Sequence, residues 1–528
     1  MGHSSVAHPL QSVKSLPRKR LWIAAAVAVA ACVLGIAVFF INAHWPYRYR
    51  VVKPLLEDVL GGQVQISRYH RTYFPRPGFA ATGITLRRKT APNLPPLGSV
   101  DTLFVQGSWI DLLMLRERIE LVDMTGVHIL VPVPGSHANQ EDFPPGSASD
   151  FTGPDTLIEN LRIHTSLLEI MRADGSRFSF PIRELQMRNF QKGRQEEFDV
   201  DMSNALPRGH IEAKGSFGPF NAGDLGRTPA RGTFKFTSVE LQDVGEIHGT
   251  TASSGSFAGT LSALETSAET DTPDFAVEDG KPTDIRGSVR VTVNGLSGAV
   301  VFHAIEATAG KTTVLAQGAV QGSPKVTDLD VKVENGRAED ILRPFIHDMV
   351  PITGPVWLHS HAHLAASGHQ LGFLQRLQVD GEFAVPAEHL TNKSDAKSLT
   401  DFSNRAQGNA EKDEVKTEPG SETDAFSSLK GPAQIRNGIA SSPHLIFQIS
   451  GADATLSGTF NFHNKDVHLT GVMAMQSDFS HITTGWKSVL LKPIAPFLRK
   501  KNAGAVVPIA VTGSPGKYKI GLDFSHKK

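Results

Sequence analysis

The chain is poor in cysteine and has no net charge, and these two features exclude several classes of protein. Its 528 residues include a single cysteine, Cys32, so an intrachain disulfide is impossible and thiol chemistry is confined to that position. Its 53 lysine and arginine residues are balanced by 53 aspartate and glutamate residues. Nucleic-acid-binding proteins usually carry a basic excess, so nucleic acid is not an expected partner.

Recognisable catalytic motifs are also missing. The sequence has no G-x-S-x-G elbow, and SPGK at Ser514–Lys517 lacks the earlier glycine of a phosphate-binding loop. The alternating residues His359, His361 and His363 could bind a metal, but no cysteine or acidic cluster stands near them in the sequence. We assign them to the solvent-facing side of a strand. We therefore expect no enzyme activity, no metal and no cofactor.

Long apolar runs are scarce too, and the sequence contains one that could span a bilayer. Leu21–Ile41 carries no charge and no proline, and as a helix it would reach about 31 Å. Basic residues crowd its N-terminal side, which predicts a cytoplasmic tail at 1–20 and a transmembrane helix at 21–41. Everything after the helix is then expected on the far side of the membrane. These basic residues are Lys14, Arg18, Lys19 and Arg20.

A cleaved signal peptide is the alternative interpretation of this run. Ala43 could end a cleavage site, but Ile41 is a poor residue two positions before it. The length of the run and this mismatch favour a retained anchor.

Period-two alternation dominates the rest of the chain. It is clearest at Asp453–His463, where apolar and polar residues alternate throughout. Such a pattern predicts strands with one apolar and one polar face, and frequent Gly, Asn, Asp and Pro between them predict antiparallel connections. The expected fold is therefore mainly β: a long, curled, mostly antiparallel sheet with a few amphipathic helices. The apolar-face residues that we single out are Phe234, Phe236, Val289, Val291, Val293, Ala454, Leu456, Phe460 and Phe462.

Helical spacing of apolar residues predicts helices at 46–61, 337–349 and 484–501. Pro344, Pro493 and Pro496 should kink or divide the last two. Polar composition predicts loops or linkers at 134–155 and 265–284, and a short helix with a linker at 392–422.

Two of these helices are candidates for contact with a membrane surface. The first follows the apolar run directly, and the third opposes apolar residues to a basic face. Simple packing against the sheet is the alternative for both. The membrane-contact candidates are Trp45, Tyr47, Leu55, Leu56, Trp486, Leu490 and Phe497.

Many one-sided strands leave a large apolar face to cover. The sheet can close on itself as a sandwich or barrel, or it can stay open as a groove. An open groove requires an apolar occupant, and lipid tails are the natural choice beside a membrane. Alternation alone does not separate the two arrangements.

The order of segments resembles the AsmA-like proteins of Gram-negative bacteria, in the branch with an AsmA-type C-terminal region. The similarity covers most of the chain and rests on loose hydrophobic patterns. Its clearest part is Leu429–Phe524, which ends in V-P-I-x-V-x-G and a final strand. The other segments that carry it are GGQVQISRYHRTYFPRPGFAATGITLRRK, VDMTGVHILVPVP, TDTPDFAVEDG and VNGLSGAVVFHAIEATAG.

This resemblance implies a single-pass protein of the bacterial inner membrane, with its bulk in the periplasm. It implies a role in outer-membrane biogenesis, in which phospholipid cargo moves along a hydrophobic β-groove. A non-catalytic scaffold for outer-membrane proteins, with a protein partner there, is the alternative. The expected regions are a periplasmic β-rich part at 44–390, a polar linker with a short helix at 391–428, and a C-terminal β region at 429–528. We expect about 30 to 35 strands at most.

Overall fold

The computed structural model describes most of the chain after residue 44. The described residues are 31–33, 35, 45–60, 62–87, 96, 98–114, 116–132, 156–171, 177–191, 193–205, 207–221, 224–244, 247–322, 325–366, 371–393, 396–397, 399–400, 403, 407, 427–475, 499–500, 503–514 and 517–522.

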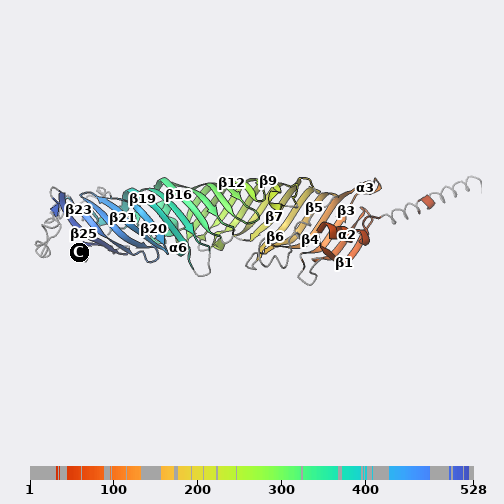
Figure 1. Ribbon diagram of the computed structural model, residues 1–528, viewed down its shortest axis with the longest axis horizontal. Helices are drawn as coiled ribbons and strands as arrows, with labels where there is room; N and C mark the ends of the chain where they lie inside the picture. Colours follow the sequence, from red (N-terminus) through yellow and green to blue (C-terminus); the bar gives the residue numbers. More distant parts are fainter. Residues whose placement is uncertain are drawn as a thin grey trace, which may run out of the picture.

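One sheet of 26 strands makes up nearly all of this structure. Successive strands are neighbours and follow one another along the long axis, from β1 beside α2 to β25 near the opposite end (Figure 1). The strands of the first half are β1 Gln63–Thr72, β2 Gly78–Arg87, β3 Gly98–Gln106, β4 Arg118–Pro132, β5 Leu157–Met171, β6 Arg177–Phe190, β7 Glu196–Ala205, β8 Arg208–Phe217, β9 Pro229–Glu240, β10 Ile247–His248, β11 Thr250–Thr260, β12 Ala263–Val277 and β13 Thr283–Val293.

The second half continues in the same way. Its strands are β14 Val300–Ala309, β15 Thr312–Val320, β16 Thr327–Arg337, β17 Ile352–Thr353, β18 Pro355–Leu364, β19 Leu377–Leu390, β20 Ser427–Arg436, β21 Ile439–Ile449, β22 Ala452–Asn461, β23 Val467–Met475, β24 Arg499–Lys500, β25 Ala503–Gly513 and β26 Lys519–Leu522. The short strands β10, β17 and β24 pair at the ends of β12, β19 and β25.

Antiparallel pairing prevails because most connections are short turns, as the glycine-rich and asparagine-rich breaks predict. The exception is β5, which runs parallel to β4. The connection between these two strands, which contains the predicted loop 134–155, lies outside the described residues. The prediction of a mainly β chain with one large sheet and few helices is confirmed.

Alternating burial explains why these segments form strands. In β22, Ala454 and Leu456 are 2% and 4% exposed, whereas the intervening Asp453, Thr455 and Ser457 are exposed. A strand places successive side chains on opposite faces, so this sequence can bury one face and hydrate the other.

The helices whose bounds fall within the described residues are short. They are α2 Tyr49–Leu60, α3 Trp109–Leu113, α5 Ala338–Leu342 and α6 Phe373–Arg376, with 3-10 turns at Leu225–Arg227, Leu241–Val244 and Arg343–Phe345. The helix predicted at 46–61 is confirmed as α2. The helix predicted at 337–349 is shorter, because Pro344 sits in a 3-10 turn that ends it.

The prediction of a loop at 265–284 is wrong. These residues form most of β12 and the start of β13, because Leu264, Thr266 and Ala268 face one way and the exposed Glu265 and Ser267 between them face the other. The acidic composition of this segment led to the loop prediction, although its side chains alternate with the two-residue period of a strand.

Three other predictions fall largely outside the described residues. Most of 484–501 does so, although Arg499–Lys500 forms a strand rather than a helix end. In 392–422, positions 393, 396–397, 399–400 and 403 are helical. In the run Leu21–Ile41, positions 31–33 and 35 are helical. Among the described residues, no helix combines the length and apolar character needed to cross a bilayer.

Buried cores lie at both ends of the described sheet. At the N-terminal end, α2 inserts Val52 against residues of β1 to β5, and the Val64 amide donates a hydrogen bond to the Glu57 carboxylate at 3.0 Å. At the C-terminal end, residues of β21, β22, β23 and β25 pack together with Leu399. A smaller cluster surrounds Val333 and Val385.

The N-terminal core supplies a stability test. Phe79 is 4% exposed within that core, so Phe79→Ala should lower the free energy of unfolding by about 3–5 kcal/mol, measured by chemical denaturation. Phe74, five positions earlier, is 90% exposed, so Phe74→Ala should change the same quantity by less than about 0.5 kcal/mol. Equal effects of the two substitutions would contradict this placement of the core.

Candidate functional site

Strand register aligns apolar side chains across almost the whole sheet. Starting from Phe79 in β2, the residue directly opposite in each next strand is uncharged, as far as Gly513 in β25. We call this row the apolar ladder. It consists of Phe79, Val105, Val122, Leu161, Met187, Phe198, Gly215, Gly232, Phe257, Thr266, Val291, Phe302, Gly318, Leu329, Ala362, Val379, Ile435, Ala440, Phe460, Val467 and Gly513.

The apolar ladder is covered at the N-terminal end and partly open in the middle. Phe79 and Val105 are each 4% exposed, whereas Phe198, Phe257 and Phe302 are only half-buried. The buried clusters involve β1 to β6, β15 to β19 and β19 to β25, but among the described residues none is centred on β7 to β14. The middle of the face therefore keeps apolar side chains in partial contact with solvent.

The structure brings the predicted apolar-face residues onto this one face. Phe234 and Phe236 of β9 and Val289 and Val293 of β13 are half-buried, and Val291 is 7% exposed. The remaining candidates lie in or beside β22. Ala454 and Leu456 are enclosed in the C-terminal core, while the half-buried rings of Phe460 and Phe462 meet edge to face with centroids 5.1 Å apart.

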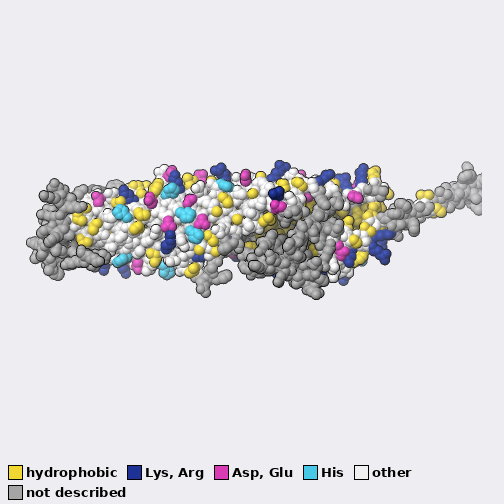
Figure 2. All heavy atoms as spheres, viewed as in Figure 1, with side chains coloured by type: hydrophobic (Ala, Val, Ile, Leu, Met, Phe, Trp, Pro, Cys, Tyr) yellow, Lys and Arg dark blue, Asp and Glu magenta, His cyan; other side chains and the backbone are white. Residues whose placement is uncertain are grey.

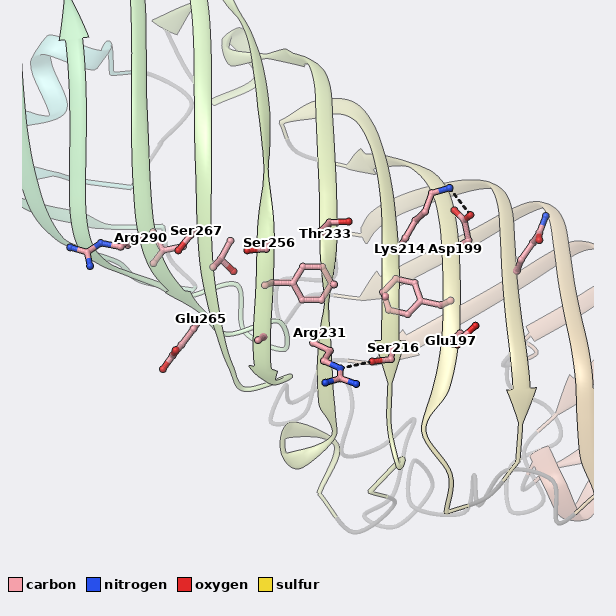
Figure 3. A pocket seen from close by; sticks show the side chains of 18 of the residues that line it. Glu197, Asp199, Lys214, Ser216, Arg231, Thr233, Ser256, Glu265, Ser267 and Arg290 are labelled. Carbon is pink, nitrogen blue, oxygen red and sulfur yellow. Dashed lines mark hydrogen bonds and ion pairs between the residues drawn. The ribbon is translucent and has the colours of Figure 1, made fainter.

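A hollow of about 1030 Å³ lies along the middle of the apolar ladder. Six ladder residues from β7 to β13 line it, and two rows of mostly polar residues flank them. Figure 3 shows one flank from Arg290 through Ser256 to Asp199, the other from Glu265 through Arg231 to Glu197, and phenyl rings between them. The ladder residues are Phe198, Gly215, Gly232, Phe257, Thr266 and Val291.

Two cationic side chains along the hollow are paired with carboxylates, and a third donates to a hydroxyl group. Lys214 Nζ lies 2.8 Å from Asp199 Oδ2, and this hydrogen bond raises the pKa of Lys214. Arg231 donates to Ser216 Oγ at 3.0 Å, and Arg188 lies 3.7 Å from Glu197. Exposed ion pairs of this kind contribute little stability. Because neighbouring residues of a strand point to opposite faces, these polar side chains lie on the face opposite the ladder side chains.

Sequence reasoning missed one group that could hold a cation. Asp201 of β7 and His210 and Glu212 of β8 offer ligand atoms within 4.8 Å of one another. The sequence pattern that could have revealed this group is the H-x-E spacing of His210 and Glu212, which places both side chains on one face of a strand. Arg183 forms an ion pair with Asp201, so a guanidinium already competes for this carboxylate.

The three alternating histidines lie on the solvent side of β18, as predicted. The sheet nevertheless supplies acidic neighbours that the local sequence does not. His363 Nδ1 lies 2.6 Å from Asp328 Oδ1, and His361 Nδ1 lies 2.9 Å from Asp330 Oδ1. Both aspartates come from β16, which pairs with β18, so strand pairing supplies acidic neighbours that the local sequence lacks.

Burial also isolates one carboxyl group at the margin of the apolar face. Glu196 is 2% exposed at the start of β7, opposite Phe217, and its Oε2 atom has no hydrogen-bond partner. Burial raises the pKa of Glu196 to about 7.

The membrane-contact candidates occupy different environments. Trp45 is 1% exposed and its ring lies between those of Tyr73 and Trp109, with centroids 4.7 and 5.7 Å away, so it is not a surface residue here. Leu55 is 52% exposed on α2. Tyr47 and Leu56 are half-buried against the N-terminal core, and Trp486, Leu490 and Phe497 lie outside the described residues.

No protein-family model matches the chain, and no curated protein matches its sequence.

The buried Glu196 carboxyl predicts a pH-dependent stability. Its folded pKa is raised, so the folded state binds its proton more tightly, and stability falls as the pH rises from the ordinary carboxyl value through about 7. Glu196→Gln should remove this fall and increase the free energy of unfolding at pH 8 by about 1–3 kcal/mol relative to the unsubstituted protein. Denaturant titrations at pH 5 and pH 8 measure the difference.

The neighbouring residue provides a matched control. The Glu197 side chain is 66% exposed on the opposite face, so Glu197→Gln should leave the pH profile within about 0.5 kcal/mol of the unsubstituted one. A Glu196→Gln protein with an unchanged profile would show that the carboxyl is not isolated from water.

Proposed function

We propose that this protein binds phospholipids by their acyl chains along the apolar ladder and conducts them along its sheet. The observation that carries the proposal is a continuous, uncharged row of side chains that is only partly covered in its middle third. A soluble protein rarely leaves a long apolar face in contact with water unless a ligand or partner covers it. Hydrocarbon tails suit such a face because apolar attraction needs no directional partner.

The glycines of the apolar face support a curled sheet. At Gly215 and Gly232, which face each other in β8 and β9, an added Cβ would collide with the backbone carbonyl of the neighbouring strand. Glycines at such places permit the sharp bends by which sheets curve. The same close approach recurs in later strands, at Gly255, Gly287, Gly318, Gly458 and Gly471.

Irregular strand pairing also favours a curved sheet. Register shifts interrupt most strand pairs from β11 to β21, for example between Phe302 and Ile305. Such bulges increase the bend and twist of a strand. We infer a groove whose concave side is the apolar face.

The proposed setting is the bacterial inner membrane and the periplasm. The predicted anchor Leu21–Ile41 would hold the N-terminal end of the sheet at the inner membrane, and the resemblance to AsmA-like proteins supports a part in outer-membrane biogenesis. No catalytic step belongs to this function. At ~4.8 Å per strand the apolar ladder extends roughly 95 Å. This is about half of the ~200 Å that a complete bridge would need at the same spacing, so the proposed path requires a second protein or copy.

A non-catalytic scaffold for outer-membrane proteins is the second candidate. The open sheet edges favour it: among the described strands, β1 pairs only with β2, and β26 pairs only with β25. An unpaired edge can accept a strand from another protein.

A charge placed on the apolar face tests lipid binding directly. Phe234 is half-buried opposite Ala213 and Gly255, so Phe234→Asp should leave the protein folded and lower the bound phospholipid at least about twofold. Phospholipid per protein, measured by mass spectrometry after detergent purification, gives the readout, and circular dichroism checks the fold.

Thr233→Asp places the same charge one residue away on the opposite face. Thr233 is exposed, so its substitution should change neither the bound phospholipid nor the circular dichroism spectrum. Unfolding of the Phe234→Asp protein would instead indicate a closed core, and equal lipid content in both variants would contradict the proposed groove.

A further inference from the structure

Exposed apolar side chains gather on two adjacent loops at the N-terminal end of the sheet. Phe74, between β1 and β2, is 90% exposed. Ile110 and Leu113 of α3 and Met114 just after it are 60–70% exposed. We call these four residues the apolar tip. None of the four belongs to the buried N-terminal core, so packing does not explain their apolar character.

The two loops lie side by side on one edge of the sheet. Gly78 at the start of β2 pairs with Gln106 at the end of β3, and the Gly107 amide donates to the Pro77 carbonyl at 2.8 Å. The buried Trp45 ring lies between Tyr73 of the first loop and Trp109 of the second. The apolar tip is therefore presented by an ordered aromatic platform.

Exposed arginines lie in or beside the same two loops. Arg71 precedes Phe74 by three positions, Arg76 follows it by two, and Arg116 follows Met114 by two. Arg76 forms an ion pair with Glu120, and Arg116 lies 3.6 Å from Asp111. Figure 2, in the same view as Figure 1, shows dark blue and yellow side chains together at the end of the molecule where α2 and α3 lie. Exposed apolar side chains beside exposed arginines match an anionic phospholipid surface, where tails lie beneath negative headgroups.

Chain length fixes how far the apolar tip can be from the predicted membrane span. Ile41 precedes Trp45 by four positions, and four residues reach about 14 Å at most. A span at Leu21–Ile41 would therefore hold Trp45 within about 14 Å of its end. Trp45 contacts both loops, so the apolar tip would lie close to the bilayer surface.

We propose that the apolar tip inserts into the anionic phospholipid bilayer that holds the anchor, and so fixes the orientation of the sheet. This contact is distinct from the lipid cargo of the apolar ladder and would form whether or not the ladder carries lipid. It adds α3 and the β1–β2 loop to α2, for which membrane contact is predicted from the sequence.

Site-specific fluorescence tests the insertion on the full chain. In a Cys32→Ser background, Phe74→Cys and Leu113→Cys each provide a single labelling position. The labelled proteins are placed in nanodiscs of phosphatidylethanolamine and phosphatidylglycerol, with or without nitroxide-labelled lipid. Quenching at both positions should lower the emission at least about twofold, because inserted side chains lie near the acyl-chain boundary.

Val301 provides the matched control. It is 47% exposed in β14, far from α3 along the sheet, so the label on Val301→Cys should show no quenching above background. Arg76→Gln with Arg116→Gln should reduce quenching at Leu113→Cys, because both remove charge beside the tip.

Two results would overturn the proposal. One is quenching at Phe74→Cys and Leu113→Cys that is no stronger than at Val301→Cys. The other is efficient disulfide formation between copies at Phe74→Cys together with the absence of quenching, which would assign the apolar tip to a second copy. Neither result would affect the comparison of Phe234→Asp with Thr233→Asp, which reports on the apolar ladder alone.

Discussion

Cross-strand register is the constraint on which the rest of the structure depends. In each strand the side chains alternate between two faces, so a shift of one residue would exchange the apolar face for the polar one. The pairings keep uncharged residues opposite one another from Phe79 to Gly513, despite bulges in many strand pairs. A continuous apolar face results from many local pairings, each of which is ordinary by itself.

The covering of that face differs along its length. At the N-terminal end, α2 and the rings of Tyr47 and Tyr69 close over Phe79, and at the C-terminal end the sheet residues pack with Leu399. These clusters supply the burial that stabilises the fold. The middle is less covered, so its apolar side chains are available for another role. Stability and the proposed binding are thus served by different stretches of one face.

The sequence was sufficient to predict the type of fold and the faces of its strands. Alternation placed Phe234, Val289 and Phe460 on one face, and the structure aligns them there. Alternation failed where acidic composition obscured it, as in Glu265–Asp284. Helix lengths were overestimated at 337–349, because periodicity does not tell how far a proline-containing stripe stays helical.

Features that depend on contacts between different strands could not be predicted from the sequence. The isolation of Glu196 opposite Phe217, and the cluster of Asp201, His210 and Glu212, arise only when strands pair. The burial of Trp45 is similar, because Tyr73 and Trp109 meet it from separate loops. A single sequence gives the periodicity of each strand but not the partners across it.

A photo-crosslinking scan of β9 tests the central claim most directly. A photoreactive amino acid is placed in turn at Thr233, Phe234, Lys235 and Phe236, and crosslinked phospholipid is measured in the full-length protein purified from membranes. The proposed function predicts phospholipid adducts at Phe234 and Phe236, and none above background at Thr233 and Lys235, in step with the two-residue period of the strand. Adducts at all four positions, or at none, would contradict a lipid-binding apolar face.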